Sequence, residues 1–194
     1  MRTLYLARHG EASGSLTEAG RTQARLLGQR LAGVPLTGVF HSPLPRAAET
    51  AALVCASLPD VPVSVSPLVG DYLPYAPTAS ELAPEFAPVA LAHVADYTTL
   101  QHETGPGLAD RALAEFTAPV DRADLVITHS QIVCWFVRAA LGAPAARWLG
   151  INAANAGLTV IRYRQGWPAT LVMFNDQSHL PPELHWTGFQ TPWP

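Results

Sequence analysis

The sequence predicts an α/β fold, and three observations carry this prediction. Short apolar runs alternate along the chain with longer segments in which apolar residues recur at helical spacing. Polar clusters directly follow several of the apolar runs, where strands are expected to give way to helices. No internal repeat, low-complexity tract or linker interrupts the pattern, and 194 residues suit one domain. We therefore expect residues 1–194 to form a single domain.

The first half of the chain predicts strands and helices in strict alternation. The expected elements are a strand over 4–7, a helix over 17–31, a strand over 39–40, a helix over 46–58 and a strand over 61–65. Thr17 stands immediately before the first helical pattern and is a suitable N-cap.

The second half begins less regularly. Prolines stand at positions 67, 74, 77, 84, 88 and 106, which predicts loops with one helix around 84–97. The remaining expected elements are a helix over 107–117, a strand over 125–128, a helix over 130–141 and a closing pair of strands over 158–164 and 170–174. The segment after Leu180 is rich in Pro and Trp and predicts no regular element.

The composition excludes several classes of protein. All twelve basic residues are arginines, so enzymes that depend on a lysine (Schiff-base, pyridoxal phosphate and P-loop enzymes) are excluded. A formal net charge of -3 argues against affinity for nucleic acid or an anionic membrane. The longest stretch without Asp, Glu, Lys or Arg, residues 31–45, is interrupted by Gly and Pro, which predicts no membrane span.

The cysteines and the N-terminus bear on the cellular compartment. Cys55 and Cys134 lie in apolar stretches and are expected to be buried, reduced thiols. The first apolar run is too short for a signal peptide. We therefore expect a soluble, cytoplasmic protein.

Three polar clusters stand between predicted strands and helices: Arg8-His9-Gly10-Glu11, His41-Ser42-Pro43 with Arg46, and His129-Ser130. If these strands are parallel, the clusters meet at the carboxyl edge of the sheet, where open α/β sheets bind ligands. Arginine forks and helix N-termini both suit phosphate oxygens. The joint placement therefore predicts a phosphate pocket. The seven histidines show no metal-ligand spacing, so no metal is expected.

These segments also carry a family resemblance. The matching stretches are Leu4–Glu11, Leu16–Ala24, Ser42–Ala51, Val126–His129 and Asn155–Gly157, which occur in the family's order. Together they resemble the histidine phosphatase superfamily, the phosphoglycerate mutase-like proteins. The resemblance implies a three-layer sandwich whose central sheet is mostly parallel, with helices on both faces.

The resemblance also implies roles for individual residues. His9 would be the nucleophile and form a phosphohistidine, with its other ring nitrogen donating to a backbone carbonyl. Arg8 and Arg46 would hold the phosphate oxygens, and a protonated His129 would contact the same oxygens. Water would then release phosphate, without any metal or cofactor.

The chain departs from the family pattern in two places near the phosphate. Ser13-Gly14-Ser15 replaces a Trp-Asn pair, and we expect Ser15 to contact the phosphate instead. Ser130 and Gln131 follow the second histidine where many relatives have glycine, and we expect them to bind substrate through a backbone N–H and a side-chain donor.

The proton donor of the family is usually a glutamate on a loop between the second arginine and the second histidine. In this chain the nearest match is Asp71, and Glu81 and Glu85 are the alternatives.

The predicted function is a cofactor-independent phosphatase that acts on a small-molecule phosphate ester, with specificity set by residues 66–106. A phosphoglycerate mutase is the first alternative, although a chain of 194 residues has little material for the lid that keeps a phosphohistidine dry. A non-catalytic module that binds phosphate or phosphoproteins is the second. The sequence does not indicate an oligomeric state.

Overall fold

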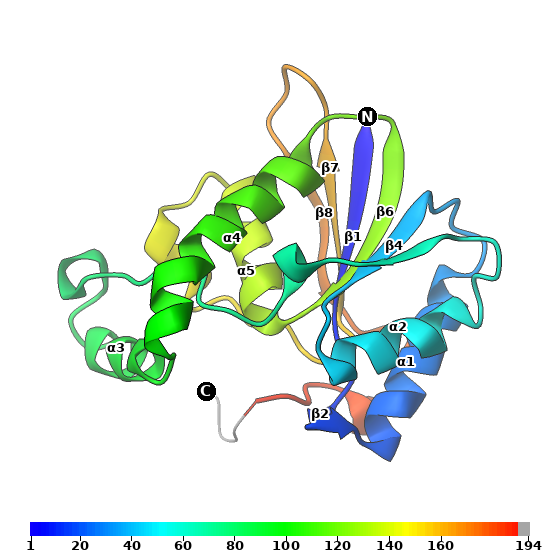
Figure 1. The fold of residues 1–194 in the computed structure, drawn as a ribbon, viewed down its shortest axis with the longest axis horizontal. Helices are drawn as coiled ribbons and strands as arrows, with labels where there is room; N and C mark the ends of the chain where they lie inside the picture. Colours follow the sequence, from blue (N-terminus) through cyan, green and yellow to red (C-terminus); the bar gives the residue numbers. More distant parts are fainter. Residues whose placement is uncertain (190–194) are drawn as a thin grey trace.

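A six-stranded sheet with helices on both faces organises the computed structural model, which describes residues 1–189 (Figure 1). The strand order is β5-β4-β6-β1-β7-β8. The strands are β1 (Arg2–Arg8), β4 (Gly38–His41), β5 (Val63–Val65), β6 (Arg122–Thr128), β7 (Leu158–Tyr163) and β8 (Thr170–Asp176), and a separate small hairpin pairs β2 (Ala12–Ser13) with β3 (Ser15–Leu16).

Parallel pairing dominates the sheet, as the sequence predicts. β1, β6, β4 and β5 run parallel, whereas β7 runs antiparallel to both β1 and β8. Arg8 of β1 lies opposite Thr128 of β6, and His41 of β4 lies opposite Ile127. The carboxyl ends of these three strands therefore meet at one edge of the sheet, which brings the three polar clusters together.

The helices form two layers, which confirms the expected three-layer sandwich (Figure 1). They are α1 (Glu18–Leu31), α2 (Pro45–Cys55), α3 (Ala87–Ala95), α4 (Thr99–Thr117) and α5 (Ser130–Ala140). Side chains of successive β1 residues point to opposite faces, so Leu4 and Leu6 pack with α4 and α5, whereas Ala7 packs with α1 and α2. No helix among residues 1–189 is long and apolar enough to span a bilayer.

The ends of the helices follow from local capping. Thr17 accepts a hydrogen bond from the Gly20 N–H and caps α1, as predicted. α4 begins eight residues earlier than the predicted start at residue 107, because Thr98 and Gln101 form a reciprocal capping box. Pro106 lies inside this helix rather than in a loop.

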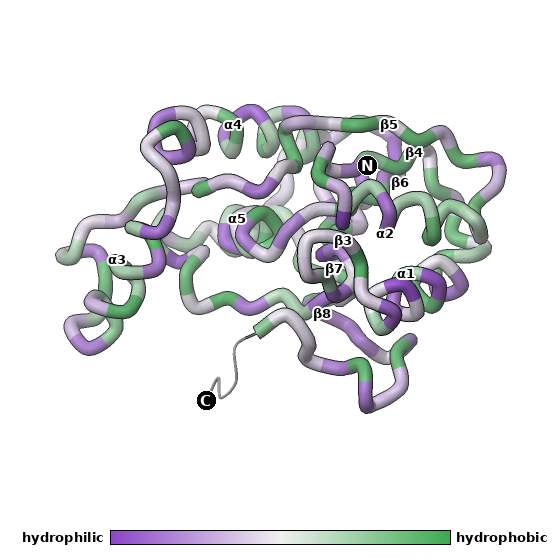
Figure 2. Tube along the Cα trace, turned by 60° about the horizontal axis from the view of Figure 1, so that its bottom comes forward, coloured by the Kyte–Doolittle hydropathy of each residue, from purple (hydrophilic) through white to green (hydrophobic). Residues whose placement is uncertain are grey.

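α3 and the C-terminal segment lie at the edges of the layered structure, although Ala90 and Val94 of α3 are buried in its core. Both views place α3 at the opposite end of the molecule from α1 (Figures 1 and 2). The C-terminal segment, expected to lack regular structure, contains a 3-10 turn over Pro182–Leu184. Beyond this turn, Gln23 of α1 donates hydrogen bonds to the Leu184 carbonyl and the Thr187 hydroxyl, which hold the segment against the core.

A buried ion pair between Arg2 and Asp124 joins β1 to β6, and it gives a stability prediction. The two side chains lie 2.7 Å apart and are nearly inaccessible to solvent. We expect Asp124→Ala to lower the free energy of unfolding by about 3 kcal/mol, because it leaves the Arg2 charge buried and unpaired. Urea denaturation measures the change. Asp121→Ala is the control, since Asp121 is fully exposed, and an equal loss in both variants would contradict the prediction.

Candidate active site

The carboxyl edge of the sheet carries a cavity of about 970 Å³. His9 follows β1, His129 follows β6, and their ring centroids lie 5.1 Å apart. Arg46 reaches the same place from the first turn of α2. All five predicted catalytic residues line this cavity, so the structure gathers side chains that are far apart in sequence: Arg8, His9, Arg46, Asp71 and His129.

His9 is held in the orientation that a nucleophile needs. Its Nδ1 lies 2.7 Å from the Gly10 carbonyl, and Arg46 Nε donates to its Nε2 at 3.1 Å. Nδ1 therefore carries the hydrogen and Nε2 carries the lone pair, which is the arrangement expected from the sequence. Burial lowers the pKa of His9 to about 3, and the charges of Arg8 and Arg46 act in the same direction. The imidazole is thus neutral at physiological pH.

His129 is fixed by Ser42, a buried residue of the second polar cluster. Ser42 Oγ accepts a hydrogen bond from the Leu44 N–H and lies 2.8 Å from His129 Nε2. The serine hydroxyl can donate its own hydrogen to Nε2, and in that tautomer the ring hydrogen is on Nδ1. This Nδ1 lies 3.6 Å from Asp71 Oδ2. Ser42 thus presents an N–H of His129 to the cavity.

The structure favours a neutral His129 over the protonated form that the family resemblance led us to expect. Burial lowers the pKa of His129 to about 2, and repulsion by His9, Arg46 and Arg8 acts in the same direction. The charges of Arg8 and Arg46, together with the exclusion of water, disfavour a positive charge on the His129 imidazole. His129 therefore acts as a neutral hydrogen-bond donor.

The two arginines supply the positive charge of the site. Arg8 donates to the Ala153 carbonyl at 2.9 Å and to the Gly188 carbonyl at 3.1 Å. Burial lowers the pKa of Arg8 to about 10, which leaves it charged at neutral pH. Within the described chain, Arg8 Nε and His129 Nδ1 are buried and have no hydrogen-bond partner. Buried donors of this kind require an acceptor, and phosphate oxygens would provide one.

Among the three candidate proton donors, Asp71 is the one that lines the cavity. Its Oδ2 lies 2.5 Å from Arg46 Nη2. Glu81 instead caps a 3-10 turn, where it accepts hydrogen bonds from the Thr78 N–H and the Tyr75 hydroxyl. Glu85 does not line the cavity. The geometry therefore favours Asp71 over both alternatives as a proton donor.

The predicted substrate-binding residues divide into two groups. Ser130 and Gln131 begin α5 and line the cavity, and the Gln131 amide donates to the Tyr97 hydroxyl at 2.7 Å. Ser15 is exposed and does not line the cavity, because Leu16 points inward and its strand neighbour must point outward. Ala12 and Gly14 of the same hairpin line it instead.

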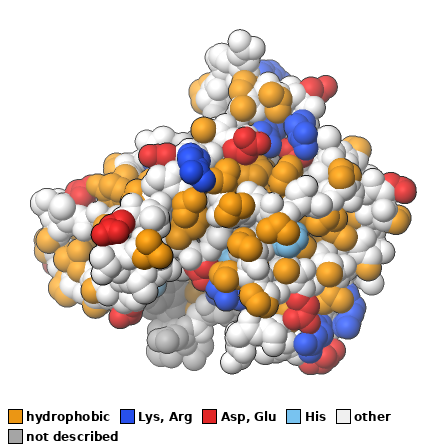
Figure 3. Space-filling view, viewed as in Figure 1, with side chains coloured by type: hydrophobic (Ala, Val, Ile, Leu, Met, Phe, Trp, Pro, Cys, Tyr) orange, Lys and Arg blue, Asp and Glu red, His pale blue; other side chains and the backbone are white. Residues whose placement is uncertain are grey.

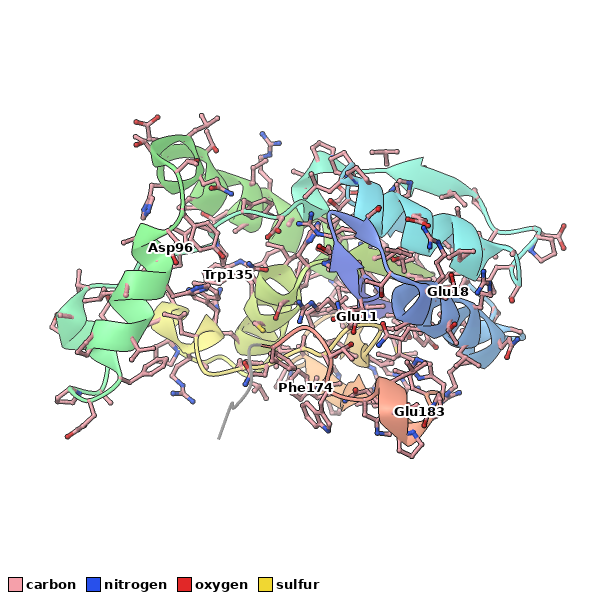
Figure 4. All side chains as sticks on the ribbon, turned by 90° about the horizontal axis from the view of Figure 1, so that it is seen from below. Glu11, Glu18, Asp96, Trp135, Phe174 and Glu183 are labelled. Atoms are coloured by element: carbon pink, nitrogen blue, oxygen red, sulfur yellow. The ribbon has the colours of Figure 1, made fainter. Side chains whose placement is uncertain are left out.

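The C-terminal segment contributes residues that the sequence did not indicate. The Phe189 ring lies 5.6 Å from the Arg8 guanidinium carbon, next to the Gly188 carbonyl that Arg8 contacts. Thr187 of this segment donates to Asn155, a residue of the family-matching stretch Asn155–Gly157, and Asn155 in turn donates to the His9 carbonyl at 2.8 Å. Figure 4, which views the molecule from below, shows this segment crossing in front of the end of the sheet near Glu11. Contacts across 180 positions leave no local signal in the sequence.

The described residues contain no cluster of three or more His, Cys, Asp or Glu side chains that could hold a metal ion.

Gly188 tests the role of the C-terminal segment. Its φ is +89°, and a Cβ there would overlap Asn155 Oδ1 and Arg8 Nη1. We expect Gly188→Ala to weaken binding of inorganic phosphate about fivefold or more, because the arginine must move, and calorimetric titration measures this change. Gly166→Ala is the matched control, since its φ is also positive and a Cβ there meets nothing within 4 Å. Equal affinities in the two variants would refute a role for the segment in holding Arg8.

The buried histidines predict a loss of stability in acid. The pKa of His9 is about 3 when folded and 6.5 in its ordinary state, so between these values the unfolded chain binds more protons. Stability should fall as pH drops through this window, by about 1.4 kcal/mol per pH unit for each neutral histidine. Urea unfolding from pH 7 to pH 4 measures the slope. His9→Asn should reduce the slope by the contribution of one histidine, about 1.4 kcal/mol per pH unit. An unchanged slope would contradict the prediction.

Comparison with known proteins agrees with this geometry. The sequence model of the histidine phosphatase superfamily (branch 1) matches residues 4–177. "Serine/threonine-protein phosphatase Pgam5, mitochondrial" of Caenorhabditis elegans is 31% identical over 93% of this chain. The chain spans 65% of the length of that relative, less than two thirds.

Solved structures share the fold. Bacillus stearothermophilus YhfR superposes with a TM-score of 0.71 at 24% identity, covering 93% of this chain and 100% of that one. The alpha-ribazole phosphatase of Shigella flexneri superposes with a TM-score of 0.67 at 24% identity, covering 90% of this chain and 96% of that one. The match of the family model to residues 4–177 shows that the chain belongs to branch 1 of the histidine phosphatase superfamily.

Proposed function

We propose that this protein is a cofactor-independent phosphatase that hydrolyses small-molecule phosphate monoesters through a phosphohistidine. The observation that carries the proposal is the neutral His9, whose Nε2 lone pair faces Arg46 in a cavity that also holds Arg8 and His129. Family membership and the phosphatase names of the relatives support it.

The first step transfers the phosphoryl group to His9. A phosphate oxygen of the substrate replaces His9 as the partner of Arg46 Nε, which frees the Nε2 lone pair to attack phosphorus. As the N–P bond forms, the bond to the leaving oxygen breaks. Arg8, Arg46 and the His129 N–H stabilise the negative charge on the nonbridging oxygens. The Asp71 carboxyl, when protonated, gives its proton to the leaving oxygen.

The second step reverses the role of Asp71. The carboxylate accepts a proton from water as the water oxygen attacks phosphorus, and the N–P bond breaks to release phosphate and restore neutral His9. The Gly10 carbonyl holds the Nδ1 hydrogen throughout, so the same nitrogen attacks in each cycle. No metal is needed in this scheme, because the arginines supply the positive charge.

The two alternative functions, a mutase and a phosphate-binding module, can be distinguished from a phosphatase by the fate of the phosphoryl group. A mutase would pass the phosphoryl group to a second alcohol instead of water, and a binding module would retain phosphate without turnover. The name of the Caenorhabditis elegans relative refers to mitochondria and to protein phosphatase activity, and both properties concern that protein. A cytoplasmic location remains the prediction for this chain.

His9 gives the direct test of the mechanism. We expect the wild type to release phosphate from p-nitrophenyl phosphate in excess EDTA and to yield an acid-labile, base-stable phosphoprotein on rapid quench. His9→Ala should lose at least about a thousandfold in kcat, because it removes the Nε2 lone pair that attacks phosphorus. His41→Ala is the control, since His41 does not line the cavity. Full activity in His9→Ala, or a rate restored only by a divalent metal, would overturn the proposal.

Asp71 gives a separate test of proton donation. An alkoxide needs a proton in order to leave, whereas nitrophenolate leaves readily without one. Asp71→Asn should therefore slow hydrolysis of an alkyl phosphate about a hundredfold and that of p-nitrophenyl phosphate less than about tenfold. Glu81→Gln serves as the control. Equal losses on both substrates would assign Asp71 to positioning of Arg46 alone.

A further inference from the structure

The cavity extends well beyond the residues that would hold phosphate. Its volume of about 970 Å³ lies at the upper end of the range for small-molecule sites, far more than one phosphate fills. We call the additional part the leaving-group region. It is lined by Phe86, Val89, His93 and Asp96, at or on α3, and by Trp148 and Leu149, which lie at the end of the 3-10 turn after α5.

The walls of the leaving-group region are largely apolar, and contacts between their side chains hold them in place. Val89 lines the cavity and is 60% exposed, so its side chain contributes accessible apolar surface to the cavity wall. Trp148 is buried, and its Nε1 donates to the Tyr75 carbonyl at 3.0 Å. The His93 ring lies 6.3 Å from the Trp148 ring, so α3 adjoins the turn that ends at Trp148. A bound apolar body would therefore meet preformed surfaces.

The charge of this region is the opposite of that at the phosphate end. Among the described residues, Arg8 and Arg46 are the arginines that line the cavity, and both belong to the phosphate end. Between Arg46 and Arg111 the sequence has no arginine or lysine. It has acidic residues there, namely Asp71, Glu81, Glu85, Asp96 and Glu103 among others. Residues 190–194 have no charged side chain.

The surface agrees with this distribution. Figure 3 shows orange and red side chains over the α3 end of the molecule, whereas the blue ones lie elsewhere on this face. Figure 4 shows Asp96 at the end of α3, on the side that faces α5 and Trp135. Asp96 also ends α3, so its carboxylate adds to the negative end of the helix dipole.

We propose that the leaving-group region takes an uncharged, largely apolar body of aromatic size and discriminates against leaving groups that carry a carboxylate. This inference rests on the proposed phosphatase function. The apolar walls favour a body that loses little hydration, and a carboxylate there meets Asp96 with no arginine among the lining residues of the region. Arg147, next to Trp148, is exposed and does not line the cavity. A phosphoglycerate, the substrate of the mutase alternative, is disfavoured for the same reason.

An isosteric pair of esters tests the charge discrimination. The wild type should hydrolyse 4-carbamoylphenyl phosphate with a higher kcat/KM than 4-carboxyphenyl phosphate. In Asp96→Asn, the ratio of the two should fall by about two- to fivefold, which is the effect of one exposed charge, and added salt should reduce the wild-type ratio. Comparing ratios between variants cancels the different reactivities of the two phenols. Glu103→Gln, which removes an exposed acid outside the cavity, should leave the ratio unchanged.

A second variant tests the apolar wall. Phe86→Ala should raise KM for the carbamoyl ester several-fold while the inhibition constant of inorganic phosphate stays constant, because phosphate alone does not reach this wall. Leu100→Ala, an exposed apolar position outside the cavity, is the control. Thermal unfolding of each variant reports whether it folds.

The outcomes separate this inference from the function on which it rests. Absence of turnover on every ester would overturn the phosphatase function and this inference with it. Turnover with a ratio that Asp96→Asn does not change, or with Phe86→Ala raising KM and the phosphate inhibition constant equally, would overturn the inference alone. A higher kcat/KM on a phosphoserine peptide than on either aryl ester would assign the region to a protein substrate and refute it as well.

Discussion

Parallel pairing of β1 with β6 brings His9 and His129 together, and the rest of the site is arranged around that pair. Arg8 lies opposite Thr128, and the His9 N–H donates to the Thr128 carbonyl at 2.9 Å. A shift of one residue in the register between β1 and β6 would turn each side chain of the shifted strand to the other face of the sheet. The buried Arg2–Asp124 pair joins the other end of the same two strands.

Desolvation determines the chemistry that this arrangement allows. The same packing that buries both imidazoles also lowers their pKa values and keeps them neutral beside two arginines. A neutral His9 retains its lone pair, and the arginines retain the charge that attracts phosphate. Asp71 offsets part of that charge through its contact with Arg46. The site therefore carries a net positive charge without any protonated histidine.

The cavity combines two environments that come from different parts of the chain. The phosphate end is built on strand ends and the first turns of helices, which hold hydrogen-bond donors rigidly. The leaving-group region is built on α3 and the turn ending at Trp148, whose inner side chains Ala90, Val94 and Trp148 belong to the core. Close packing constrains these buried side chains, whereas the exposed Val89, His93 and Asp96 are free to vary.

The sequence by itself determined the elements and the edge at which the chemistry lies. Periodicity and capping are local properties, so α1 with its cap at Thr17 and the strand end before His9 could be predicted correctly. Only the tertiary structure decided that Ser15 faces solvent, that His129 is neutral, and that Phe189 lies over Arg8. Exposure, desolvation and contacts across 180 positions depend on how the whole chain packs, and no local pattern records them.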